Sequence, residues 1–255
     1  MNFPIELRLL GYTINLHMLL ETLAFFIGFR YYTYLKKTHI DLISTSNRSW
    51  ILIGAIFGAL LGSRLLGALE EPDKLMTATY PLLYIYMNKT ILGGLLGGLW
   101  VVEITKKILG EKNSSGDLFT FPLLLAMVIG RIGCFFNGIT EKTYGIPTSF
   151  ITGMDLGDGV LRHPVALYEI FFLVLLWISI YFIEKKHTFE NGYRYQFFMI
   201  SYCLFRYCMD FIKPIDAYFY GIGTIQIACL VALFYYSKTI YTLLFHPSSL
   251  LIHEQ

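Results

Sequence analysis

The sequence predicts an all-α integral membrane protein with about seven transmembrane helices. Of its 255 residues, 55% are hydrophobic and only 15% are charged, against about a quarter in soluble domains. A soluble chain of this composition would have to expose much of its apolar surface. The apolar residues also gather in runs of about 20, the length that a helix needs to cross a bilayer.

The expected spans differ in how clearly the sequence predicts them. The third is glycine-rich and carries Glu103, and the sixth is interrupted by Arg206 and Asp210. The first reads as a membrane anchor, because no cleavage site of small residues follows it. A further apolar run, 80–87, is too short to span and is expected to be interfacial or re-entrant. The seven ranges are 13–33, 49–68, 91–109, 118–137, 165–183, 195–213 and 222–244.

Lysine and arginine residues beside the span ends predict the orientation, because cytoplasmic loops carry an excess of both. The connections after the first, third and fifth spans hold ten of them, against six on the other side. We therefore expect the N-terminus outside and the C-terminus in the cytoplasm. We also expect a single polytopic domain over 1–255. Its two long loops, about 69–90 and 138–164, then lie outside, and loops of this length are often functional.

Of the ionisable residues inside the expected spans, seven stand out as candidates for a functional role. A charge at the centre of a span costs about 2.5–3.5 kcal/mol to insert, so such residues mark functional sites. Arg206 and Asp210 lie one helical turn apart and can simply pair. Arg131 has no such local partner and needs a carboxylate from another span or an anionic ligand. The seven are Glu21, Arg64, Glu103, Arg131, Glu169, Arg206 and Asp210.

The segment 130–138, GRIGCFFNG, predicts a polar site for a phospholipid. A guanidinium group stays charged when it is desolvated, and it holds phosphate through two hydrogen bonds. Gly130 and Gly133 flank Arg131 and remove side-chain bulk, so a helix or a ligand can come close.

Two groups of polar residues at the starts of spans form a plausible acid–base set. His17 and Glu21 lie one turn apart in the first span. His163 and Tyr168, with Glu169, open the fifth span beside Pro164, a residue that suits a helix start. A purely structural histidine is the alternative at His163.

Several other kinds of site find no support. The glycine run 93–98 has small residues four apart, which lets helix backbones approach closely, and it lacks the Lys-Ser/Thr of a phosphate loop. The histidines are scattered without His-x-x-x-His spacing, so no metal site and no cofactor are expected. The four cysteines are expected to be free thiols. The basic residues are spread along the cytoplasmic rim, so no nucleic-acid partner is expected.

Three motifs follow one another in a recognisable order. Segment 130–138 resembles Gly-Arg-x-Gly-Asn-Phe-x-Asn, HPVALYE at 163–169 resembles His-Pro-x-x-Leu-Tyr-Glu, and FRYCMDF at 205–211 resembles Phe-Arg-x-x-x-Glu-Phe. Arg64 in GSRL and His17 in the first span also fit. Together these motifs resemble the prolipoprotein diacylglyceryl transferase family, along nearly the whole chain.

The resemblance implies an enzyme of the bacterial cytoplasmic (inner) membrane. Its partners would be phosphatidylglycerol, whose diacylglyceryl group is moved, and a preprolipoprotein, whose lipobox cysteine thiol accepts it. By resemblance, Arg131 and Arg206 hold the phosphate, Asn137 orients the headgroup, and His163 and Glu169 shape the mouth of the cavity. The expected catalytic residues are Arg131, Arg206, Glu141, His163 and His17, and the expected substrate-binding residues are Arg131, Asn137, Gly145, Tyr168, Glu169, Asp210, Arg64, Gly93, Gly94 and Glu21.

The chain departs from the family pattern where its chemistry is expected. Leu92 stands in Leu-Gly-Gly where the family usually has His-Gly-Gly, so a favoured general base is missing. Cys134 replaces the Asn of the signature, and Ile139 stands where the signature continues with Glu, in Gly-Arg-x-Gly-Asn-Phe-x-Asn-x-Glu. Glu141, after an apparent insertion, is expected to take over the carboxylate role.

Lys89 or His17 is then expected to serve as the base. Two alternatives stay open: a related phospholipid-dependent transferase with a different acceptor, and a non-enzymatic membrane protein that binds or transports lipid.

Overall fold

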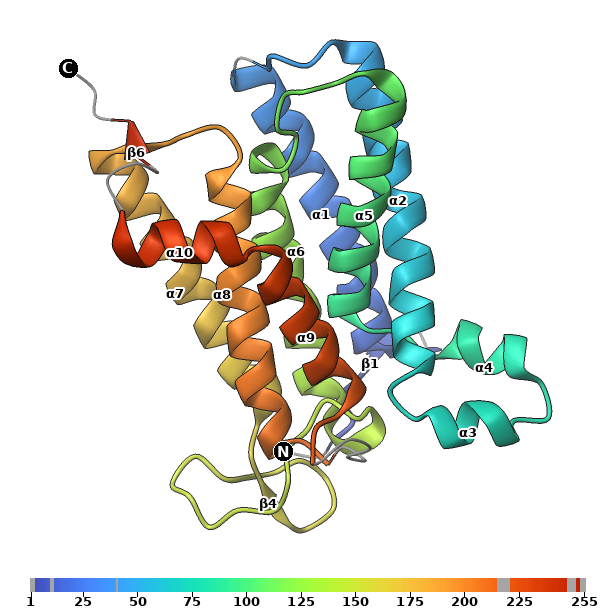
Figure 1. Ribbon diagram of the computed structural model, residues 1–255. Coiled ribbons are helices and arrows are strands. Elements are labelled where there is room, and N and C mark those ends of the chain that lie inside the picture. Colours follow the sequence, from blue (N-terminus) through green and yellow to red (C-terminus); the bar gives the residue numbers. More distant parts are fainter. Residues whose placement is uncertain (1–2, 10–11, 40, 215–220, 247–250, 253–255) are drawn as a thin grey trace.

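The computed structural model is a bundle of long helices with short helices and two-stranded sheets at its ends (Figure 1). The structure describes residues 3–9, 12–39, 41–214, 221–246 and 251–252. The long helices are α1 (Leu16–Thr38), α2 (Thr45–Ala68), α5 (Ile91–Leu109), α6 (Asp117–Asn137), α7 (Val165–Lys186), α8 (Tyr193–Met209) and α9 (Thr224–Tyr235).

The smaller elements lie mostly at the two ends of the bundle. Helices α3 and α4 sit beside the lower end in Figure 1, and the strands form three antiparallel pairs. The short helices are α3 (Pro72–Thr77), α4 (Pro81–Met87), α10 (Ser237–Phe245), η1 (Gly138–Thr140) and η2 (Asp210–Ile212), and the pairs are β1 (Glu6–Leu9) with β2 (Tyr12–Asn15), β3 (Met154–Asp155) with β4 (Leu161–Arg162), and β5 (Thr188–Phe189) with β6 (Leu251–Ile252).

Each range expected to span falls on helix. Within the described part of the chain, three helices are both long and apolar enough to cross a membrane: α2, α7, and α6 continued through η1. The last expected span, 222–244, is not straight, because α9 and α10 are bent by 65° where they meet. The fold is therefore mostly helical with three or four candidate spans.

Two local features place side chains at the lower end of the bundle. The side-chain oxygen of Asn15 accepts hydrogen bonds from the backbone N–H groups of His17 and Met18, which starts α1 and sets His17 in its first turn. Asn137 is the last residue of α6. The next residue, Gly138, has a φ of 59°, a backbone conformation that glycine adopts easily.

Helices α2 and α5 pack closely because glycines face each other. A Cβ atom added at Gly97 would lie 2.3 Å from the carbonyl oxygen of Gly58, and one added at Gly93 would lie 2.3 Å from that of Gly62. The spacing of small residues in 93–98 therefore does what the sequence predicts. At Gly94 the nearest atom would be 3.7 Å away, an ordinary contact.

We expect Gly97→Ala to lower stability by about 1–3 kcal/mol, the usual cost of overpacking. The same substitution at Gly94 should be neutral or stabilising, because alanine favours helix over glycine by up to about 1 kcal/mol. Thermal unfolding of both variants in detergent measures the difference. Equal melting temperatures would contradict the close approach of α2 and α5.

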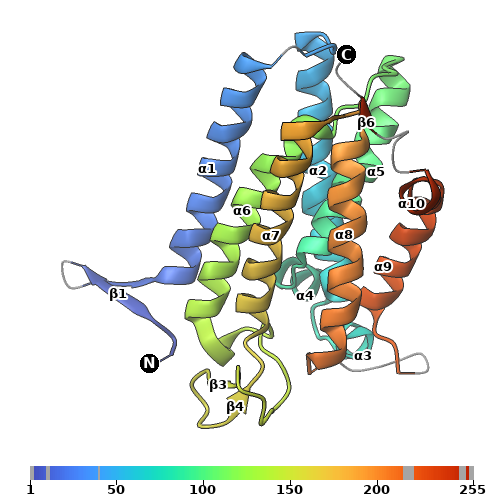
Figure 2. The same cartoon turned by 90° about the vertical axis from the view of Figure 1, so that its left-hand side faces the viewer.

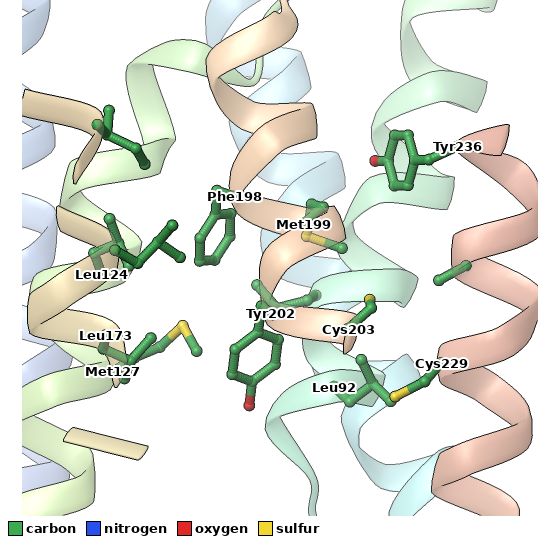
Figure 3. Packing of buried hydrophobic residues seen from close by; sticks show 14 of the residues in the cluster. Leu92, Leu124, Met127, Leu173, Phe198, Met199, Tyr202, Cys203, Cys229 and Tyr236 are labelled. Atoms are coloured by element: carbon green, nitrogen blue, oxygen red, sulfur yellow. The ribbon is translucent and has the colours of Figure 1, made fainter. Parts of the chain in front are cut away.

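The apolar core joins α5, α6, α7, α8 and α9 (Figure 3). Leu92 is only 1% exposed and lies in this cluster beside Cys229. Tyr202 is also fully buried, but its hydroxyl points out of the cluster. The position at which the family pattern usually has a histidine is thus an apolar core position here.

A buried ion pair fastens the end of the bundle at which α1 ends and α2 begins. Arg48 donates from Nε to Asp41 over 2.7 Å and from Nη1 to the carbonyl oxygen of Ser115 over 3.0 Å. Burial raises the pKa of Asp41, but hydrogen bonds from Arg48 and from the backbone N–H of Ile43 outweigh it and hold that pKa below its usual range.

Replacing Asp41 with Asn should cost about 3–5 kcal/mol, because it leaves the buried Arg48 without its carboxylate. In the wild type this stabilisation is complete at neutral pH. It is lost as the pH falls below the ordinary aspartate value of about 4, because the unfolded chain then binds a proton that the folded chain resists. Thermal unfolding against pH measures both effects. Asp73→Asn, an exposed site, is the control, and an equal loss there would contradict the role of the pair.

Candidate active site

The polar residues predicted from the sequence gather at one end of the bundle. At this end α1, α5, α7 and α9 begin, and α2, α6 and α8 end (Figure 2). Both long loops lie here too, and Lys142 of one forms an ion pair with Glu71 of the other. The site is thus built from helix ends that are covered by two joined loops.

Arg131 finds its carboxylate on another helix. Its Nε lies 2.8 Å from Oε1 of Glu169, and the same oxygen accepts a hydrogen bond of 3.0 Å from the hydroxyl of Tyr202. Arg131 is 7% exposed and Glu169 only 1%. Glu169 therefore lies buried beside Arg131, and its expected role at the mouth of a cavity stays a prediction.

Arg206 pairs with Asp210 as their spacing in the sequence predicts. Nη2 of Arg206 lies 2.9 Å from Oδ1 of Asp210 and 4.0 Å from Oε1 of Glu70. Nη1 of Arg206 is buried and has no hydrogen-bond partner within the described residues. A buried guanidinium group with an unused donor suits an anionic ligand.

His17 lies between two carboxylates. Its Nε2 is 3.0 Å from Oε1 of Glu141 and 3.8 Å from Oε2 of Glu21, and Nζ of Lys89 holds Glu21 at 2.5 and 2.6 Å. Burial raises the pKa of Glu141, but its contact with His17 outweighs burial and holds the pKa below its usual range. Glu141 is therefore ionised at neutral pH, and Lys89 is engaged by Glu21. Of the two expected bases, Lys89 is paired with Glu21, and His17 is the imidazole that Glu141 can orient.

Gly133 makes room for the imidazole ring. A Cβ atom added there would lie 3.2 Å from Nδ1 of His17. Cys134, the next residue, lies 3.8 Å through Sγ from Nη1 of Arg131. The signature segment thus contacts both the histidine and the arginine parts of the site.

The loop 138–164 carries a second group of expected residues. Nδ1 of His163 lies 3.1 Å from the hydroxyl of Tyr168, which also hydrogen-bonds Thr152. The backbone N–H of Gly145 donates to the carbonyl oxygen of His163 over 2.9 Å. Among the described residues no hydrogen bond or ion pair joins His163 to Arg131. The structure thus brings His163 together with Tyr168, and a catalytic role for His163 stays a prediction.

The remaining expected residues lie apart from the charged groups. Arg64 stacks over the ring of Tyr86 at 5.0 Å, and Gly93 packs against α2. Asn137 is buried at the end of α6. Glu103 pairs with Lys106 at 3.2 Å near the opposite end of α5, as expected of a charge at a helix end.

Three residues of this region are not predicted from the sequence to be site residues. Tyr202 lies one turn before Arg206 on α8, and this spacing indicates that the two residues share a face of the helix. Glu70 lies in a loop, and no pattern in the sequence indicates that it comes close to Arg206. Cys134 was read as a plain thiol, but its sulfur and ligand atoms of His17 and Glu141 all lie within 4.8 Å of one another.

The sequence model of the family described as "Prolipoprotein diacylglyceryl transferase" matches residues 4–245. The chain belongs to this family. It is 29% identical over 224 residues to the phosphatidylglycerol–prolipoprotein diacylglyceryl transferase of Campylobacter jejuni (strain RM1221), covering 83% of this chain and 77% of the relative. It is 26% identical over 243 residues to the transferase of Finegoldia magna, covering 90% of each chain.

Membership of the diacylglyceryl transferase family makes the differences at the site more informative. Leu92 lies in the core, so no side chain at that position supplies a base. His17 stands with Glu141 at the end of the bundle instead.

Proposed function

We propose that this chain transfers the diacylglyceryl group of phosphatidylglycerol to the lipobox cysteine thiol of preprolipoproteins, the first step of lipoprotein maturation. Membership of a transferase family supports the class of reaction. The observation that carries the proposal is the pair of buried arginines, Arg131 and Arg206, at the end of the bundle that holds His17.

The two arginines stabilise the charge of the leaving group. The sulfur of the acceptor forms a bond to the glyceryl carbon as the bond from that carbon to the phosphate oxygen breaks, and glycerol phosphate leaves with the electron pair. Negative charge grows on the phosphate in this step. Arg131 and Arg206 stabilise it in a dry site, where fixed donors are most effective. Glu169 and Asp210 keep the two guanidinium groups in place between turnovers.

His17 provides for the thiol. The thiolate is the nucleophile, so the proton must leave before or during the attack. In our proposal Nε2 of His17 takes it, and Glu141 stabilises the resulting imidazolium. Glu21, held by Lys89, adds a second carboxylate on the same side.

The placement in the membrane is also part of the proposal. We propose seven crossings of a bacterial cytoplasmic (inner) membrane by a single domain over 1–255, with the N-terminus outside and the C-terminus in the cytoplasm. The excess of lysine and arginine beside three connections supports this orientation. The charged end of the bundle then faces outwards, on the side where exported preprolipoproteins present their cysteine.

Expression in cells depleted of their own transferase tests the proposed reaction. Lipoproteins isolated from these cells should gain the mass of one diacylglyceryl group. Arg131→Ala is the inactive control, and immunoblotting shows equal amounts of protein. A well-folded wild type that leaves lipoprotein mass unchanged would overturn the proposed acceptor.

A related transferase with a different acceptor is the second candidate. The changes at Leu92, Cys134 and Ile139 favour it, because all three fall in motifs of the expected chemistry. Purified protein with labelled phosphatidylglycerol separates the two. Release of glycerol phosphate without labelling of a lipobox peptide would favour the second candidate.

A further inference from the structure

Three potential metal ligands from distant parts of the chain meet beside Arg131. Ligand atoms of His17 at the start of α1, Cys134 near the end of α6 and Glu141 after η1 all lie within 4.8 Å of one another. No spacing in the sequence predicts that these three residues come together. This is a different feature from the paired arginines, since each of the three residues offers a donor atom to a cation.

The imidazole ring of His17 points into this group with its nitrogens uncommitted. Its side chain is only 10% exposed, and neither ring nitrogen has a hydrogen bond of good geometry within the part of the chain described. Nε2 has ion-pair contacts with Glu141, at 3.0 Å, and with Glu21, at 3.8 Å. A buried polar group without hydrogen bonds needs an explanation, and an ion is one of the usual ones.

The donor set selects the metal. One nitrogen, one thiolate sulfur and one carboxylate oxygen are the ligands that zinc takes, whereas magnesium and calcium prefer oxygen alone. Ligand atoms around tetrahedral zinc lie about 3.3–3.6 Å apart, given bonds of about 2.0–2.3 Å. Side-chain movements of about an ångström from the present positions would bring the three into this range.

The charges around the group also suit a bound dication. A thiolate and a carboxylate together neutralise the charge of Zn²⁺, and Nη1 of Arg131 lies 3.8 Å from the sulfur. The charge of Arg131 is itself balanced by Glu169 at 2.8 Å. Glu141 is 33% exposed, so the group is open to solvent on one side.

We propose that His17, Cys134 and Glu141 form a mononuclear zinc site. Three protein ligands leave the fourth position to water or an added thiolate, as in zinc sites that exchange ligands. Binding rests on this geometry alone. One consequence rests on the proposed function: zinc at Nε2 of His17 competes with the proton for that nitrogen, so it inhibits turnover.

Cobalt(II) binding to the full-length protein in nanodiscs tests the site. The wild type should bind one cobalt ion per chain, show a thiolate-to-cobalt charge-transfer band and lose that band when zinc is added. Cys134→Ser should abolish the band and weaken binding by at least about 100-fold, since even partners outside the ligand set are worth about 10–100-fold.

The matched control is Cys208→Ser, which removes an exposed cysteine of α8 and should keep the band. Glu141→Gln changes a loop residue outside the helices, so it keeps the test decisive if Cys134→Ser does not fold. It should keep the band and bind cobalt more weakly. A wild type without the band, or a Cys134→Ser protein that retains it, would overturn the site.

Inhibition of turnover by zinc is measured in a separate experiment. The activity of each protein with zinc is compared with the activity of the same protein in chelator. Zinc should inhibit the wild type and Cys208→Ser at concentrations at least about 100-fold below those that affect Cys134→Ser. Equal sensitivity of all three would overturn the inhibitory role. If no protein shows turnover, the proposed function fails, while the cobalt band still decides whether the metal site exists.

Discussion

Arg131→Lys is expected to lower kcat/KM for diacylglyceryl transfer by about 100- to 1,000-fold, the usual cost of one misplaced donor to a developing charge. Lysine keeps the positive charge beside Glu169, so the buried carboxylate stays paired. It loses the planar fork that holds a phosphate through two hydrogen bonds. The effect should therefore fall on the reaction rather than on the fold.

Turnover of labelled phosphatidylglycerol and the melting temperature should both be measured for this variant. Arg30→Lys is the matched control, because Arg30 is an exposed residue of α1. It should keep full activity. If Arg131→Lys also keeps the wild-type kcat/KM, the assignment of Arg131 to the phosphate is wrong.

What the sequence predicts best is which residues share one face of a helix. Arg206 and Asp210 are four residues apart on α8, and they pair as expected. The glycines of 93–98 also lie at helical spacing, and they pack against α2. In both cases the geometry follows from the helix itself, so knowledge of the bundle is not needed.

Contacts between helices could not be derived in this way. Nothing in the sequence shows that Glu169 of α7, rather than Glu21 or Glu103, meets Arg131 of α6. Two distant segments likewise bring Cys134 to His17, and only the packing of α1 against α6 reveals this contact. Hydropathy also marks 222–244 as apolar without showing the bend between α9 and α10.

His17→Gln is expected to lower kcat/KM at neutral pH by about 100- to 10,000-fold, the range for a lost general base. In the wild type the histidine removes the thiol proton. In the variant the reaction depends on free thiolate, which increases about tenfold per pH unit until the pH nears the ordinary thiol pKa of about 8.5. The deficit should therefore shrink as the pH rises.

The pH profile between about 6 and 8.5 distinguishes this role from a structural one. The logarithm of kcat/KM for His17→Gln should rise with a slope near 1. Glu141 does not contribute to the wild-type profile, because its contact with His17 holds its pKa below the usual range. Chelator in every assay removes any contribution from a bound metal. His39→Gln, at the far end of the same helix, is the control and should follow the wild type. A His17→Gln profile parallel to the wild type at every pH would exclude His17 as the base.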